Sequence, residues 1–324
     1  VTMKNGFLAP GSSVVASARS FGRRAVSAEY GVNDGKLAGY VAGTWLDEDG
    51  WRLFSPDQLR QIYADVGYES GPWMIDLSFT GAENHLSGQS PAPVQELAVD
   101  RSLIFTSPQQ NVNRLAFVTL NGSYKAAEDL TLQLNAYHRV YRQRVDNGNT
   151  TSYVGCTSLA DTLCQEDGTT VVFDGSGDPI PDLSLGGALP IGQNDLQTIL
   201  TRSTGGAIQV VSDADLFGRT NHLAVGASLD RAQTSFGSRT EVGVINSDLV
   251  VLPSGLFVSE PEGTDFNATP VDLGATSTYY GLYASDTWNL SPALALTASA
   301  RFNVARIELD DRIGTQLTGE ATYR

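Results

Sequence analysis

Residues 276–309 decide the fold, and they read TSTYYGLYASDTWNLSPALALTASARFNVARIEL. In the second half of this stretch the side chains alternate strictly, so an extended chain would carry an apolar face and a more polar face. Such a strand is longer than the ~5 to 6 residues usual in soluble proteins. It matches the roughly 9 to 11 tilted residues that cross a bilayer. The apolar positions are Leu294, Leu296, Ala298, Ala300, Phe302 and Val304.

A similar strand precedes this one and ends in Trp288, and residues 289–292 (Asn, Leu, Ser, Pro) turn the chain back. An apolar outer face, a polar inner face, a tight turn and an aromatic side chain beside it predict one hairpin of a transmembrane β-barrel. Asp286 conflicts with the pattern, because strict alternation puts its carboxylate on the lipid-facing side. Either Asp286 reaches the membrane interface, where a charge costs little, or a β-bulge shifts the register.

The composition of the 324-residue chain agrees with a barrel and excludes several other classes. Charged residues make up 18%, and no apolar run approaches the ~18 residues of a membrane helix. The mean hydropathy of −0.13 would suggest a soluble protein. Transmembrane barrel strands do not raise this mean, however, because half of the residues in each strand are polar. The net charge of −15 argues against nucleic acid as a partner, since a phosphate backbone needs a basic surface.

The same alternation recurs along the chain and predicts roughly eleven strands. The connections near Asn33, Ser70, Ala127, Arg231 and Leu290 are tight, whereas those between them, after the first, are long and polar. The longest connections are expected at 83–112, 144–217 and 246–275, and a turn at 230–233 is expected to separate strands at 223–230 and 235–244. Loops sorted in this way are typical of outer-membrane barrels, with short periplasmic turns and longer extracellular loops.

Large aromatic side chains recur beside the tight turns on the apolar face. Together they predict an aromatic girdle at one membrane interface. Each one alone is better explained as an ordinary packed aromatic residue. The girdle residues are Tyr30, Tyr68, Trp73, Tyr124 and Trp288.

Catalytic and metal-binding patterns are absent from the sequence. Cys156 and Cys164 are too far apart for a C-x-x-C motif, and a local disulfide in an oxidising compartment is favoured over two free thiols. The segment 174–178 (DGSGD) has some likeness to a calcium loop, but Leu185 stands where an EF-hand needs a bidentate Glu, so a flexible surface turn is favoured. We therefore expect no enzyme, no metal site and no cofactor.

Several segments, in this order and spacing, together carry a resemblance to a known family over essentially the whole chain. They are VTMKNGF, ARSFGRRAVSAEYG, YVAGTWLDEDGWR, FTGAENHLSGQSPAPVQELAVDRSLIFTSPQQNVNRLAFVTLNGSY, FGRTNHLAVGASLDRAQTSF and YYGLYASDTWNLSPALALTASARFN. The sequence resembles the TonB-dependent outer-membrane receptors. VTMKNGF is similar to the last strand of the plug domain of these receptors.

The resemblance implies a 22-stranded barrel closed by an N-terminal plug, which imports a scarce, bulky ligand with energy transmitted through TonB. Residues 1–11 are expected to be the end of the plug and a linker, and residues 12–324 the N-terminal part of the barrel. About eleven strands would be half of such a barrel, so the chain is expected to be a portion of a longer precursor that does not transport alone. The implied location is the outer membrane of a Gram-negative bacterium.

The implied partners are the lipid bilayer, the protein's own plug domain, TonB through a missing N-terminal region, and a ferric siderophore or similar nutrient. Cobalamin, haem and oligosaccharides remain open as ligands. The alternation of side chains along the strands predicts that some polar side chains face the lumen. These side chains would either meet an anionic ferric chelate or contact the plug and the water in the lumen. Ligand contacts are expected mainly from the long loops. The predicted lumen-facing residues are Tyr137, Arg139, His222, Arg301 and Asn303.

Two other functions fit parts of the pattern. A passive porin would share the barrel but lack a plug and a TonB box. A soluble or surface-attached β-rich adhesin or lectin would instead pack the apolar side chains of its strands into a shared core.

Overall fold

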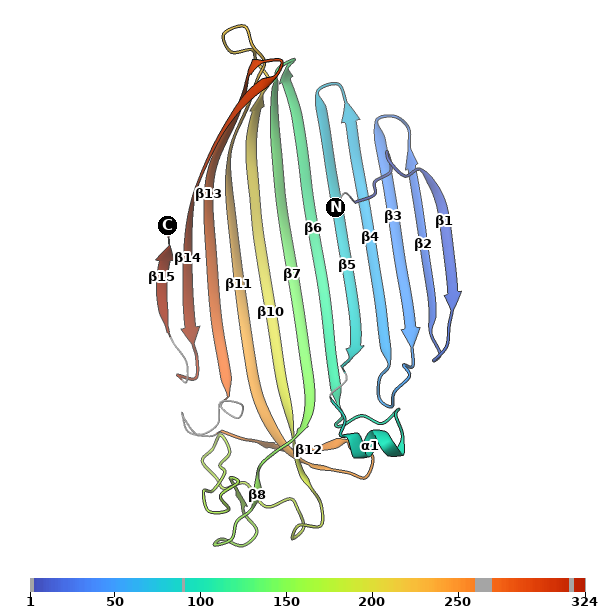
Figure 1. The fold of residues 1–324 in the computed structure, drawn as a ribbon, viewed down its shortest axis with the longest axis vertical. Helices are drawn as coiled ribbons and strands as arrows, with labels where there is room; N and C mark the ends of the chain where they lie inside the picture. The colour runs from blue at the N-terminus through green and yellow to red at the C-terminus, as the bar shows by residue number, and fades with distance from the viewer. Residues whose placement is uncertain (1–2, 89–90, 260–269, 315–317, 324) are drawn as a thin grey trace.

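The computed structural model describes residues 3–88, 91–259, 270–314 and 318–323. Its main feature is a 13-stranded antiparallel sheet in which each long strand pairs with the next one along the chain (Figure 1). This confirms the all-β, antiparallel prediction. The strands on the main path are β1 (Gly11–Ala18), β2 (Arg24–Asn33), β3 (Leu37–Glu48), β4 (Asp57–Ser70), β5 (Trp73–Ser87), β6 (Gln109–Ala127), β7 (Leu130–Thr150), β10 (Ile191–Ser212), β11 (Asn221–Ile245), β13 (Val271–Ser291), β14 (Leu294–Asp311) and β15 (Gly319–Tyr323).

Short turns join the strands at one end of the sheet, the upper end in Figure 1, which we call the turn end. Between β2 and β3, the Asp34 carboxylate accepts hydrogen bonds from the backbone N–H groups of Lys36 and Leu37 at 2.9 and 2.8 Å. Gly35 follows with φ +90°, a conformation that a residue without Cβ adopts at low cost. Gly71 (φ +56°) has the same role between β4 and β5.

The long connections gather at the opposite end, which we call the loop end (Figure 1). The described residues between β5 and β6, between β7 and β10 and between β11 and β13 lie here, whereas residues 89–90 and 260–269, the latter within the predicted loop 246–275, lie outside the described part of the chain. They contain the remaining elements, which are α1 (Val94–Val99), β8 (Val154–Gly155), β9 (Leu163–Cys164) and β12 (Val251–Phe257). The predicted sorting of short and long connections to opposite ends is therefore present.

Two predicted elements are wrong, and the predicted loops 83–112 and 246–275 also overlap strands, since β5 ends at Ser87, β6 begins at Gln109 and β13 begins at Val271. The segment 144–217 is not one irregular insertion, because it contains the end of β7 and all 22 residues of β10. There is no turn at 230–233, since β11 runs unbroken through these residues for 25 residues. The tight connection near Arg231 lies instead at 213–220, between β10 and β11.

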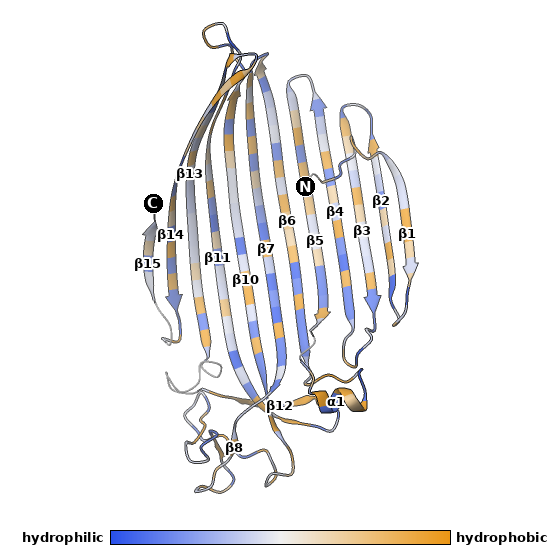
Figure 2. Ribbon diagram, in the orientation of Figure 1, coloured by the Kyte–Doolittle hydropathy of each residue, from blue (hydrophilic) through white to orange (hydrophobic). Residues whose placement is uncertain are grey.

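These two errors have one physical cause. The loop-end halves of β10 and β11 carry polar residues on both faces, so the alternation that marks a half-buried strand fades there. Figure 2 shows hydrophilic residues gathered in the loop-end parts of β7 and β10. The predicted total of roughly eleven long strands is still met, because one strand was missed and another was divided in two.

The register assigns every strand residue to one of two faces, because directly paired residues project to the same side. One face carries apolar side chains that are exposed in the described structure, including Leu282 (60%), Leu296 (57%) and Leu77 (49%). We call it the convex face. A sandwich would bury these side chains in a shared core, so their exposure contradicts that arrangement.

The other face is polar and its side chains bond to one another across the sheet; we call it the concave face. The Tyr137 hydroxyl on β7 donates to Asp230 on β11 at 2.8 Å, passing over β10. The Tyr283 hydroxyl on β13 donates to Gln209 on β10 at 2.7 Å, passing over β11. Glycine makes these crossings possible, because a Cβ at Gly205 or Gly226 would collide with the tyrosine ring above it.

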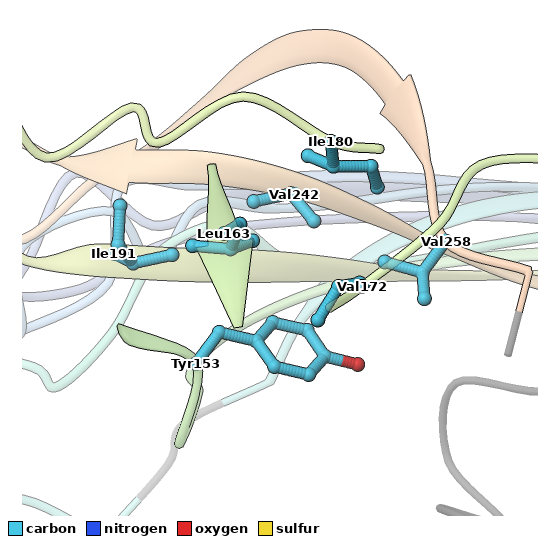
Figure 3. Close-up of a cluster of buried hydrophobic side chains, with 7 residues drawn as sticks. All are labelled: Tyr153, Leu163, Val172, Ile180, Ile191, Val242 and Val258. Carbon is cyan, nitrogen blue, oxygen red and sulfur yellow. The ribbon is translucent and has the colours of Figure 1, made fainter. Parts of the chain in front are cut away.

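The buried apolar cluster lies at the loop end and not within the sheet (Figure 3). Side chains from the connection 151–190 pack on the ends of β10 and β11 and on the segment after β12. Leu163 and Val172 are fully buried there. The long connection therefore folds as a small structure whose core is shared with β10, β11 and the segment after β12. The members of this core are Tyr153, Leu163, Val172, Ile180, Ile191, Val242 and Val258.

The described N-terminal residues 3–10 lie against the concave face near the turn end. The Lys4 ammonium is 2.8 Å from the Glu29 carboxylate, and the Asn33 side chain donates to the Gly6 carbonyl at 3.0 Å. The Phe7 ring covers Gly67 on β4.

The structure also decides the register at Asp286. The pairing of β13 with β11 is continuous from Trp288↔Asn221 onward, and the shift in the β13–β14 register lies between Asn289 and Ser291, closer to the turn. Asp286 therefore lies on the convex face, near the turn end, where its carboxylate accepts a hydrogen bond from the Asn221 side chain at 2.6 Å. The second alternative, a β-bulge that shifts the register at Asp286, is therefore not observed.

Candidate functional site

The candidate site is the polar concave face, which holds a cavity of about 390 Å³ lined by β5, β6, β7, β10 and β13. Carboxamide and hydroxyl groups are prominent in its wall, and several of them hydrogen-bond to one another across the strands. The Asn135 amide donates to Asn121 at 2.7 Å, and the Gln209 amide donates to Gln133 at 2.9 Å. Such groups can both donate and accept, so the wall suits water and polar ligands without demanding one charge.

Four of the five predicted lumen-facing residues lie on this face, although none of them lines the cavity itself. Arg139 reaches the Ser203 hydroxyl at 3.4 Å. Arg301 donates to Asn303 at 2.9 Å, and its guanidinium carbon lies 6.0 Å from the centroid of the Tyr283 ring. Tyr137 is held by Asp230, as described above. These contacts hold two cations on a concave face that also carries the carboxylates of Asp76 and Asp230.

The fifth predicted residue, His222, also projects to the concave face but lies apart from the other four. It sits at the turn end, where its ring nitrogen Nδ1 is 2.6 Å from the Asp213 carboxylate. Both side chains are exposed.

A second polar group on the concave face was missed by sequence reasoning. Asp65 on β4 is 2% exposed, and the Tyr63 hydroxyl donates to its carboxylate at 3.4 Å. Asp76 on β5 lies beside it in a cavity that Phe7 also lines. Strand parity alone identifies Tyr63, Asp65 and Asp76 as inward-facing, but it gives no sign that the N-terminal segment covers them. Gln209 was missed for a different reason, since it lies on the unrecognised strand β10.

The five predicted girdle residues lie on the convex face, each within a few residues of the turn end of its strand. Trp73 and Tyr124 are direct register partners whose ring centroids are 4.3 Å apart. Trp288 contacts the Phe217 ring at 5.9 Å between centroids and donates its indole N–H to the Leu216 carbonyl at 3.2 Å. Tyr30 and Tyr68 are 53% and 39% exposed. Phe217 was not identified from the sequence because it belongs to the misplaced turn.

The loop-end structure carries the two cysteines, and Cys156 and Cys164 form a disulfide there. Asp167 closes the adjoining turn by accepting from the backbone N–H groups of Thr169 and Thr170, both at 2.8 Å, and from the Thr170 hydroxyl at 2.6 Å. These hydrogen bonds hold the pKa of the Asp167 carboxyl well below its usual range.

The predicted flexible turn at 174–178 is ordered by a comparable arrangement. The Asp174 carboxylate accepts from the backbone N–H groups of Ser176 at 2.8 Å and Asp178 at 3.0 Å. Within the described ranges, no group of His, Cys, Asp and Glu side chains is arranged to hold a metal ion. No helix in the described part of the chain is long and apolar enough to cross a membrane.

Comparison with solved structures gives strong matches to one kind of protein. The unliganded ferric citrate transporter FecA matches with a TM-score of 0.65 and 10% identity over 96% of this chain. FpvA of P. aeruginosa, bound to a heterologous pyoverdine, matches with a TM-score of 0.66 and 14% identity over 96% of this chain. The siderophore receptor PiuA from Acinetobacter baumannii matches with a TM-score of 0.62 and 12% identity.

These matches confirm the predicted fold class, an antiparallel sheet of the outer-membrane β-barrel type. The chain spans 39% of the FecA chain, 38% of the FpvA chain and 44% of the PiuA chain. At the sequence level, no family model and no curated protein matches.

Proposed function

We propose that this chain belongs to the TonB-dependent outer-membrane receptors and forms barrel wall of a receptor for a ferric siderophore or a similarly bulky nutrient. The observation that carries the proposal is the combination of a lipid-suited convex face with a polar concave face, in the fold of receptors for iron chelates. The concave face offers carboxamides, hydroxyls, carboxylates and two arginines, a set of groups that suits the passage and binding of a polar ligand. We therefore infer a receptor in the outer membrane of a Gram-negative bacterium.

Each surface has a role in this proposal. The convex face contacts the bilayer, with Tyr30, Tyr68, Trp73, Tyr124 and Trp288 as the aromatic girdle at the periplasmic interface. Residues 1–11 are the end of the plug and its linker, and residues 12–324 are barrel. The contacts of Lys4, Gly6 and Phe7 with the concave face support this division, because a plug fills the barrel interior. TonB would act through sequence that lies outside this chain.

Ligand recognition is assigned to two regions. Arg139 and Arg301 supply positive charge that an anionic ferric chelate would meet on its way through the lumen. The loop-end structure built on 151–190 supplies an ordered outer surface, and recognition commonly resides in loops held by a rigid scaffold.

Uptake measurements test this function. A strain lacking the gene should lose uptake of at least one radiolabelled ferric chelate from a panel of siderophores, and a plasmid copy should restore it. Uptake should stop when the proton gradient is dissipated or TonB is deleted. Uptake that persists without an energised inner membrane would instead indicate a passive porin, and the receptor proposal would be wrong.

A further inference from the structure

Five arginines on the convex face form a continuous group at the border of the apolar band, and we call it the arginine stripe. It crosses four adjacent strands, β6, β7, β10 and β11. This clustering stands out in a chain with 21 Lys and Arg against 36 Asp and Glu. Its members are Arg114, Arg142, Arg144, Arg202 and Arg231.

The register brings these side chains together. Arg114 on β6 is directly opposite Arg142 on β7, and Arg144 is the next residue on that face of β7. Arg202 pairs with Val140, so it lies diagonally next to Arg142. Arg231 pairs with Thr204 and is diagonal to Arg202 in the same way. Diagonal neighbours on one face of a sheet are roughly 7 to 8 Å apart, within reach of long side chains.

The height of the stripe on the sheet coincides with the end of the apolar band. On β11 the outward residues Val225, Ala227 and Leu229 are followed directly by Arg231. From Asn221, at the turn end, to Arg231 the strand rises about 33 Å, which a tilt of about 40° reduces to roughly 25 Å, the usual height of the apolar band of a barrel. The guanidinium groups therefore lie at the level of the lipid head groups on the loop-end side.

An aromatic side chain marks the same level. The register row through Arg142 and Arg114 continues across Glu83 and Arg60 to Trp45. Trp45 is 40% exposed on the convex face, at the end of its strand remote from the girdle. Tryptophan on the outside of a barrel is typical of the membrane interface.

Among the described residues, carboxylates act on only two members of the stripe, and one of these carboxylates is Asp146, which attracts Arg144. Arg114 pairs with Glu83 at 2.9 Å, and both side chains are partly exposed. The side chains of Arg142, Arg202 and Arg231 are exposed and make no hydrogen bond or ion pair to any residue that the structure describes. The direct opposition of Arg114 and Arg142 is unfavourable, because like charges facing each other across strands repel. An anion bound between the strands would relieve this repulsion.

We propose that the arginine stripe binds the phosphate groups of anionic lipids in the membrane leaflet on the loop-end side. Guanidinium groups bind phosphate oxygens in bidentate fashion, and they do so best where the surroundings are only partly hydrated. The lipid source follows from position, since the stripe continues directly from the apolar band and an acyl chain below a bound phosphate would lie against that band. This inference rests on the proposed membrane location of the convex face.

Lipid titration followed by native mass spectrometry tests the proposal on the protein encoded by the full gene, refolded in detergent. The probes are diphosphorylated lipid A, neutral phosphatidylcholine and inorganic phosphate. Each arginine beside an anionic lipid surface contributes about a fivefold factor in affinity. The double variant Arg142→Gln/Arg202→Gln should therefore bind lipid A about 25-fold more weakly than the wild type. Phosphatidylcholine binding should not change.

The matched control is Lys125→Gln/Arg219→Gln, which removes two cations at the turn end and should leave lipid A binding unchanged. Heat-modifiable migration in gels establishes that each variant is folded. Equal lipid A affinity in the folded stripe variant and the wild type would overturn the proposal while leaving the barrel intact. Displacement of lipid A by millimolar inorganic phosphate would overturn it too, by assigning the stripe to soluble anions. Failure of the wild type to take up any lipid would count against the membrane location itself.

Discussion

Asp286 illustrates how a single charge is accommodated on the apolar convex face. Its carboxylate is near the turn end of β13 and accepts a hydrogen bond from Asn221, which is 7% exposed. The Asn221 amide therefore gives the charge a hydrogen-bond donor at the turn-end edge of the apolar face. The period-2 pattern placed Asp286 on this face correctly, but the pattern could not reveal a partner 65 residues away.

Removing that partner should be costly. Asn221→Ala leaves the Asp286 carboxylate without its amide donor, and we expect a loss of about 1 to 3 kcal/mol in the free energy of unfolding. The double variant Asn221→Leu/Asp286→Leu should recover most of the loss, because no polar group is then left unpaired. Urea unfolding in lipid vesicles, followed by tryptophan fluorescence, measures both. If Asn221→Ala is as stable as the wild type, the hydrogen bond does not contribute to the free energy of unfolding.

Asp167 gives a pH dependence outside the membrane-spanning segments. Its folded-state pKa is depressed below the ordinary value of 3.8 by hydrogen bonds from Thr170 and Thr169. The stabilisation is therefore complete above the unfolded pKa and is lost as the pH falls through the lower folded pKa. In hydrogen exchange, corrected for the intrinsic rate, the amides of Thr169 and Thr170 should be equally protected at pH 4.5 and at pH 7. Asp167→Asn should weaken their protection at both values, and unchanged protection would contradict the assignment.

At the level of elements, a strand can be predicted from the sequence only where one of its faces is polar and the other is apolar. Leu294 to Val304 on β14 alternates without exception, and its register and boundaries follow the prediction closely. Arg202 and Thr204 on β10 lie beyond the apolar band on the outward face, where either face can be polar. β11, for example, has 25 residues and spans about 80 Å along its length, so most of it extends beyond the apolar band.

Adjacent residues on β14 test this division of faces. Ala300 and Ser299 lie at the same depth but project to opposite sides, and the Ser299 hydroxyl bonds to Ser285 at 2.8 Å on the concave face. Ala300→Arg should cost about 2 to 4 kcal/mol, as expected for a cation facing lipid near the midplane. Ser299→Arg, the matched control, should cost much less because the concave side is wet. Folding titrations in vesicles compare the two, and equal costs would mean that the faces are misassigned.

The disulfide belongs to the loop-end element alone. Closing the short loop between Cys156 and Cys164 contributes about 2 to 3 kcal/mol to the stability of that element by chain entropy. Cys156→Ala/Cys164→Ala should speed proteolysis within 151–190 several-fold while leaving heat-modifiable migration of the sheet unchanged. Identical cleavage rates, or loss of the folded sheet, would show that the loop-end structure is not an independent unit.

At the scale of the whole molecule, the fold class followed from the alternation of side chains and the sorting of loops, both of which are local in sequence. The candidate site was only partly predictable. The alternation of side chains along each strand identified Arg139, Tyr137, Arg301 and Asn303 as inward-facing, because the face of the sheet to which a side chain projects depends only on this alternation. It could not reveal that Tyr283 reaches over Gly226 to Gln209, because that contact depends on the curvature of a sheet whose strand β10 was not recognised.

The central claim is that the convex face of this sheet contacts lipid while the concave face contacts water. The most direct test places a nitroxide spin label at each single introduced cysteine from 294 to 304 in the refolded protein in vesicles. Accessibility to dissolved oxygen should peak at the even positions, which include Leu296 and Phe302, and accessibility to a water-soluble nickel chelate should peak at the odd positions, which include Ser299 and Arg301. A reversed period, or accessibilities that do not alternate, would contradict it.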